Sequence, residues 1–340
     1  KAQDMRAYFL TLSYWLSGST DNIADMLRLL VSRYADGARR SLRGTLDPQP
    51  PRRYPEIGLY HPRMAGRIGE SLRELPAPED ARGTVGLLVM RSYVLAGNTR
   101  HYDRVIAALE ARGLRVVTAF ACGLDNRPAV ERFFMDGKGR ATVDAVLSLT
   151  GFSLVGGPAF NDARAAEEIL ARLDVPYLTA QALEFQSVDQ WEASAAGLTA
   201  IEATMMVAIP ELDGATAPVV FGGRSGGADT AMVGIDDRIE RIAGRIDKLV
   251  ELRATAPAER NVAIVLYDFP PNGGATGTAA HLSVFESLHR TLRAMQAEGY
   301  DVDVPPSVEA LRERVLGGNA ERFGTDANVL ARIAVDDHVR

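Results

Sequence analysis

Short apolar runs separated by amphipathic helical segments are the feature that most restricts the fold of this 340-residue chain. The runs are rich in β-branched residues and lie at 84–90, 114–120, 143–149, 175–179, 217–222 and 261–267. They are apolar at both odd and even positions, which is typical of strands covered on both faces. The first two runs are separated by about 30 residues from start to start, as in a βαβ crossover. We therefore predict an α/β fold built on mostly parallel, doubly wound sheets.

The N-terminal part is expected to be helical. Apolar residues at steps of three and four predict a helix that starts at Thr20 or Asp21 as N-cap and stops at Gly37. The proline-rich segment 44–55 (GTLDPQPPRRYP) is the predicted linker. Residues 1–53 are therefore predicted to be a helical segment that continues from a missing N-terminal region.

Two Rossmann-like units are predicted after the linker. The first spans 54–234 and contains five of the apolar runs. A helix that begins near Ile235, with isoleucines at alternating steps of four and three, is expected to lead to the second unit. The second unit opens with the run at 261–267 and is expected to be truncated, so 235–340 comprises the linker helix and part of a second α/β unit.

Composition excludes several classes of protein. The chain is 46% hydrophobic and 24% charged, which fits a globular protein, and no apolar run approaches the roughly 20 residues of a membrane-spanning helix. Its net charge of −6, without basic residues interleaved with aromatics, argues against nucleic acid as a partner. The single cysteine, Cys122, excludes an internal disulfide. A cytoplasmic protein without an integral membrane segment is expected.

A glycine-rich loop at 273–278, between the predicted strand at 261–267 and a helix, is one candidate site. Backbone N–H groups at such a helix start favour an anion. The loop contains Gly274 and Gly277 but lacks the lysine of a phosphate-binding P-loop. It is either a structural turn or a loop that faces a ligand.

Three side chains are further candidates. Arg91 ends the first predicted strand, where its guanidinium could pair with a propionate or with a group within the fold. His101 opens the next helix, at the mouth of the first βα turn, and His281 flanks the apolar stripe of the last long helix. The five histidines show no i+3 or i+4 pair, so no self-contained metal site is predicted. The small, apolar stretch 148–158 suits either a flat aromatic ligand or tight packing.

Eight segments, in this order, carry a family resemblance: YPEIGLYHP (54–62), TVGLLVMRSYVLAGNTRHY (84–102), VERFF (130–134), SLTGFSLVGGPAFND (148–162), LDVPYL (173–178), VAIPELDG (207–214), APVVFGGR (217–224) and AIVLYDFPPNGGATGTAAHLSVFESL (263–288). Together they resemble the large-subunit family of magnesium chelatase and aerobic cobaltochelatase. The wording of the second and fourth segments is most similar to the bacteriochlorophyll-type large (H) subunit of magnesium chelatase.

The resemblance implies a function that depends on partners. The large subunit would hold protoporphyrin IX while Mg²⁺ is inserted, ATP would be hydrolysed by the I and D AAA+ subunits, and the downstream methyltransferase would be a further partner. The porphyrin-cleft candidates are Arg91, His101, Gly274, Gly277 and His281. The catalytic residues are expected beyond Arg340, so the fragment alone is expected to be inactive. The alternatives are a cobaltochelatase acting on a corrin, or a non-catalytic module that docks the AAA+ partners.

Overall fold

The computed structural model describes residues 2–76, 78, 80–157, 159–227, 231–267, 276–279, 281–317 and 333–338. The chain forms two compact units, Lys1–Glu251 and Leu252–Arg340. The three-part division predicted from the sequence, with boundaries at 53 and 234, stays a prediction.

The first unit is built on an eight-stranded sheet with strand order β10-β9-β8-β5-β3-β4-β1-β2. Strands β3, β4, β5, β8 and β9 are parallel, whereas β1, β2 and β10 add antiparallel edges. The strands are β1 (Ile57–Tyr60), β2 (Ile68–Gly69), β3 (Gly83–Leu88), β4 (Leu114–Ala121), β5 (Ala145–Ser148), β8 (Tyr177–Ser187), β9 (Thr216–Arg224) and β10 (Met232–Gly234). The α/β class and the first five predicted strands are confirmed.

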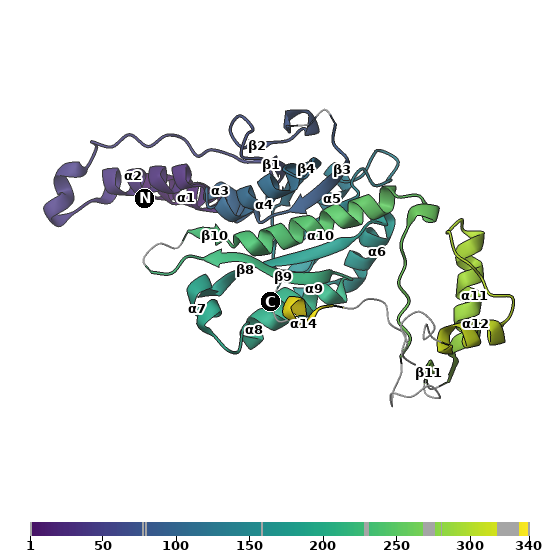
Figure 1. Cartoon of the computed structure of the whole chain (residues 1–340). Helices are drawn as coiled ribbons and strands as arrows, with labels where there is room; N and C mark the ends of the chain where they lie inside the picture. Colours follow the sequence, from purple (N-terminus) through teal and green to yellow (C-terminus); the bar gives the residue numbers. More distant parts are fainter. Residues whose placement is uncertain are drawn as a thin grey trace. The chain divides into compact units, whose positions relative to one another are not determined.

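Helices cover both faces of this sheet. On one face α4 and α10 bury their apolar stripes, and on the other face α5 and α6 do so. Figure 1 shows α10 lying along the sheet. The helical elements from α3 to α10 are α3 (Arg91–Leu95), α4 (Arg100–Glu110), α5 (Arg127–Phe133), α6 (Ala163–Leu173), α7 (Val188–Ala193), α8 (Ala200–Ala203), the π-helix η3 (Thr204–Ala208), α9 (Ile209–Leu212) and α10 (Asp236–Ala254).

Burial of both faces explains why β3 is apolar at both odd and even positions. Val85 and Leu87 pack in the core beneath α4 and α10, whereas Leu88 packs in the opposite core with α5 and α6. Gly86 also faces that second core, where an added Cβ would lie 2.8 Å from the ring of Phe134. Glycine therefore makes room for an aromatic ring at the end of α5.

An antiparallel helical pair, α1 (Ala2–Ser17) and α2 (Thr20–Tyr34), precedes the sheet and is followed by η1 (Gly37–Leu42). Tyr14 packs against Met26 and Leu29 between the two helices. The N-cap of α2 is Ser19, whose side chain accepts a hydrogen bond from the backbone N–H of Asn22. The prediction of Thr20 or Asp21 was wrong by one or two residues because Thr20 is already helical. The predicted linker contains no helix or strand, and the short η2 (Leu72–Glu74) follows β2.

The second unit contains α11 (Val284–Ala297), α12 (Val308–Leu316) and the short elements η4 (Pro257–Glu259), β11 (Thr278–Ala279), β12 (Leu282–Ser283) and α14 (Val335–His338). The predicted strand at 261–267 is wrong, because this segment has no regular structure. Val265 is 92% exposed and Tyr267 is 67% exposed. A strand needs at least one neighbour to pair with, and the described part of this unit pairs no strand with this segment. The second α/β unit stays a prediction.

Candidate functional site

The parallel strands place their carboxyl ends at one edge of the sheet. From β3 the chain passes to β4 on one side and later to β5 on the other, so β3 lies at the topological switch point. Ligands of open α/β sheets bind outside the carboxyl ends of strands at such a point. We therefore expect a ligand site at the loops that follow β3, β4 and β5.

A pocket of about 560 Å³ lies between the loops that follow β4 and β5, and we call it the carboxyl-edge pocket. Its volume falls in the range of small-molecule sites, which is about 300–1,000 Å³. Its apolar side chains are Leu124, Val155, Ala159 and Phe160, and its charged side chains are Asp125, Arg127 and Asp162.

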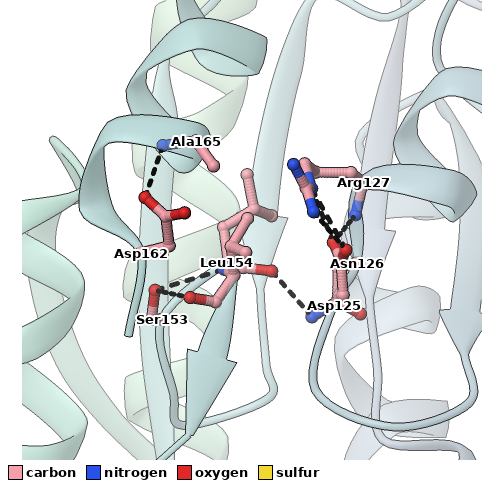
Figure 2. Close-up of polar contacts among 8 residues, drawn as sticks. Asp125, Asn126, Arg127, Ser153, Leu154, Asp162 and Ala165 are labelled. Carbon is pink, nitrogen blue, oxygen red and sulfur yellow. Dashed lines mark hydrogen bonds and ion pairs between the residues drawn. The ribbon is translucent and has the colours of Figure 1, made fainter. Parts of the chain in front are cut away.

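Backbone contacts hold the two loops of this pocket together. Asn126 N–H donates to the carbonyl of Leu154 at 3.0 Å, and Gly156 N–H donates to the carbonyl of Leu124 at 2.7 Å. Figure 2 shows the first of these contacts between the neighbouring loops. The loop after β5 then forms a small hairpin of β6 (Gly156–Gly157) and β7 (Phe160–Asn161). The walls of the pocket are thus fixed by main-chain pairing.

A buried carboxylate accepts hydrogen bonds from the loop after β5 and holds it in place. Asp213, which is only 3% exposed, accepts hydrogen bonds from Leu154 N–H at 2.7 Å and from the Ser153 hydroxyl at 3.0 Å. Burial raises the pKa of Asp213 above its ordinary value. Asp162 caps α6 by accepting from the N–H of Ala165 at 3.0 Å (Figure 2). Both carboxylates hold backbone, and only Asp162 lines the pocket.

An ion pair forms the polar wall of the pocket. Arg127 donates from Nε to Asp125 Oδ1 at 3.0 Å and from Nη2 to Asp125 Oδ2 at 2.6 Å (Figure 2). The hydrogen bonds from Arg127 hold the pKa of the Asp125 carboxyl below its usual range. The Arg127 side chain nevertheless stays 43% exposed.

Arg91 lines a neighbouring pocket of about 290 Å³ at the same edge of the sheet. This pocket shares Leu124 with the carboxyl-edge pocket and is closed on another side by the end of α1. The guanidinium of Arg91 donates to the carbonyls of Pro55 at 2.9 Å and Tyr54 at 3.3 Å. Arg91 therefore reaches the carboxyl edge, as expected, but its hydrogen bonds also fasten the segment that leads into β1 to α3.

His101 lies in the core. Its ring is 0% exposed and packs between Tyr102, with ring centroids 3.8 Å apart, and Phe221, at 5.7 Å. Neither ring nitrogen has a hydrogen-bond partner in the structure. Burial lowers the pKa of His101 to about 3, so the ring is neutral at ordinary pH. The backbone of His101 lies where it was predicted, at the start of the helix after the first βα turn, but its side chain is buried in the core.

The remaining predicted site residues belong to the second unit. Gly277 adopts a positive φ of 72° directly before the β11–β12 hairpin, and His281, with φ of 61°, lies exposed in its turn. Gly274 lies outside the described residues. Their role in a porphyrin cleft stays a prediction.

Sequence reasoning missed two prominent members of the pocket, Arg127 and Phe160. Its nearest signal was the small apolar stretch 148–158, which leads into the β6–β7 hairpin. Arg127 gave no signal, because its place beside that stretch depends on two loops that are distant in the sequence.

Within the described residues, no three His, Cys, Asp or Glu side chains gather closely enough to hold a metal ion. None of the helices in the described part of the chain is long and apolar enough to span a membrane. The apolar side chains that line the carboxyl-edge pocket suit an apolar organic ligand.

Residues 12–340 match the family model described as CobN/Magnesium Chelatase. The chain belongs to this family. Over 99% of its length it is 50% identical to the H subunit of the magnesium chelatase of Cereibacter sphaeroides, and it spans 29% of that protein. It is 36% identical to ChlH, the chloroplastic magnesium-chelatase subunit of rice, of which it spans 25%. Among solved structures, the catalytic subunit of cobaltochelatase from Mycobacterium tuberculosis matches 93% of the chain with a TM-score of 0.67 and 26% identity, over 25% of that subunit.

Gly156 should be required for the β6–β7 hairpin of this CobN/magnesium chelatase segment. It adopts a φ of 125°, and an added Cβ would lie 2.3 Å from the carbonyl oxygen of Phe160. We expect Gly156→Ala to destabilise the fold by about 2 kcal/mol, with a melting temperature about 5 °C lower by calorimetry. Gly137→Ala is the control, because its Cβ would meet nothing within 4 Å. Equal melting temperatures for the two variants would contradict this role.

The buried neutral ring of His101 should make stability depend on pH. Its pKa is about 3 in the folded chain, against about 6.5 when unfolded, so the unfolded state binds the proton first as pH falls. We expect His101 to account for about 2 kcal/mol of the stability lost between pH 7 and pH 5. His101→Phe keeps an aromatic ring and should remove this part of the loss in urea unfolding curves. The same pH dependence in the variant and in the original chain would show that His101 takes up its proton at the same pH in the folded and unfolded states, which would contradict this prediction.

Proposed function

We propose that this chain is part of the porphyrin-holding subunit of a cytoplasmic magnesium chelatase, which inserts Mg²⁺ into protoporphyrin IX. The observation that carries the proposal is the 50% identity to a magnesium-chelatase H subunit over 99% of the chain. Identity to the cobaltochelatase subunit of known structure is 26%, which supports the magnesium reaction over cobalt insertion into a corrin.

The chemistry of the reaction explains why such a subunit needs partners. Mg²⁺ gives up its water reluctantly, and the porphyrin must lose two pyrrole protons before the metal can enter. In the proposal, ATP is hydrolysed by the I and D AAA+ subunits, which are the partners that the family resemblance implies; this sequence carries no Walker motif of its own. The downstream methyltransferase, which would receive the product, is a further partner in the proposal.

The contribution of this segment is to hold the ligand. Apolar walls and few charges at the carboxyl edge favour a large, flat ring over a hydrated ion. We assign proton removal to residues outside this chain, as the resemblance to the chelatase large subunits implies. Gly277 and His281 stay candidates for contacts from the second unit.

The segment should be inactive by itself. We expect no magnesium protoporphyrin when the 340-residue chain is mixed with the I and D subunits, ATP, Mg²⁺ and protoporphyrin IX. A full-length family member that contains this segment should produce it under the same conditions, as measured by the fluorescence of the product. Circular dichroism of the segment is the control that tests whether it is folded in the assay. Product from the segment alone would refute the proposed division of labour.

Arg91 should contribute to porphyrin affinity if it reaches a propionate. In the full-length protein we expect Arg91→Ala to weaken protoporphyrin binding about tenfold, the size of one charge-assisted hydrogen bond, and Arg91→Lys to weaken it less. Fluorescence-quenching titrations measure both, with Arg164→Ala as a control because Arg164 is paired to Glu168 on the exposed side of α6. His101→Phe enters the same titration. Unchanged affinity in a variant removes that residue from the proposed cleft.

A further inference from the structure

Two large apolar side chains stand exposed together at the carboxyl-edge pocket. Phe160 is 72% exposed and Leu124 is 42% exposed, although they lie on different loops. Exposed apolar residues that line a concave site with a few polar groups mark a ligand site more often than chance exposure does. Phe160 follows directly after the turn of the β6–β7 hairpin, so the fold presents its ring rather than hiding it.

Glycines allow the two apolar side chains to share the pocket. A Cβ on Gly157 would lie 2.3 Å from Cδ1 of Leu124, and one on Gly156 would meet the backbone of Phe160. Without a Cβ at Gly157 the hairpin approaches Leu124 closely, so Leu124 and Phe160 line one pocket. Their apolar side chains suit the face of an apolar ring.

The charges of the pocket restrict the ligand further. Arg127 is the cation among its lining residues; Asp125 is paired to it, and Asp162 is a second carboxylate in the lining. A polyphosphate would meet two negative groups for one positive group, which disfavours nucleotides. A single carboxylate at the edge of an apolar ring needs only the exposed part of the Arg127 guanidinium.

We propose that the carboxyl-edge pocket holds one edge of a planar tetrapyrrole, with Phe160 against the ring face and Arg127 beside one peripheral carboxylate. The inference rests on the proposed function and names the place on this segment where that ligand docks. Phe160 and Arg127 act here as binding residues. Gly156 allows the close backbone approach within the hairpin that carries Phe160. Asp213 holds the segment before the hairpin by accepting a hydrogen bond from Leu154 N–H.

The test uses the full-length family member and protoporphyrin IX as the probe, with tryptophan fluorescence quenching as the readout. Phe160→Ala should weaken binding about tenfold or more, because the substitution removes the aromatic ring that contacts the ligand. The matched control is Phe185→Ala, since Phe185 is also exposed, at 54%, but lies on β8 and does not line the pocket. Its affinity should stay within about twofold of the original.

The dimethyl ester of protoporphyrin IX tests the role of Arg127. It carries the same ring without free carboxylates, so Arg127→Gln should weaken binding of the free acid about tenfold and leave binding of the ester unchanged. Both substituted side chains are exposed, so we expect both variants to fold, and melting curves are the control.

The possible results separate the two proposals. Normal porphyrin affinity in both Phe160→Ala and Arg127→Gln would overturn the pocket assignment and leave the proposed function standing. No porphyrin binding and no chelatase activity by the unaltered full-length protein would overturn the function itself. Equal losses for Phe160→Ala and Phe185→Ala would also reject the pocket, because a distant exposed phenylalanine would then matter as much.

Discussion

Burial of both faces of the central parallel strands is the constraint on which the first unit depends. β3 places Val85 and Leu87 under α4 and α10 and places Leu88 under α5 and α6. Since a parallel strand needs a crossover helix to reach its neighbour, the same burial dictates the alternation of strands and helices along the chain. It also brings the carboxyl ends of β3, β4 and β5 to one edge, and the pockets lie at this edge.

The loops at that edge are irregular in sequence but well supported. Asp213 lies about 60 residues beyond the loop it holds, and its two hydrogen bonds satisfy a buried N–H and a buried hydroxyl that would otherwise be costly. Gly156 allows the two strands of the hairpin to approach each other, and Gly157 allows the hairpin to approach Leu124 in the loop after β4. Binding sites on loops work when such contacts fix their geometry before the ligand arrives, because less conformational freedom is then lost on binding.

His101 illustrates how a plausible sequence argument can reach the correct backbone position and a different side-chain environment. The helix start after β3 is a common place for a functional histidine, and α4 does begin there. The ring turns inward because Tyr102 and Phe221 offer stacking partners in the core. Arg91 had two open interpretations, and the structure shows hydrogen bonds to the carbonyls of Tyr54 and Pro55, a local role that sequence could not specify.

The sequence by itself determined the α/β class, five strands of the first sheet and the long helix α10, because burial on both faces of a strand and on one face of a helix leaves a periodic record in the residues. It did not determine the structure of the segment at 261–267, because an apolar run forms a strand only where partner strands are also present. The antiparallel edges, the ion pair of Asp125 with Arg127 and the exposure of Phe160 were decided only by tertiary structure. These features depend on how segments that are distant in the chain are brought together, and local periodicity carries no information about such contacts.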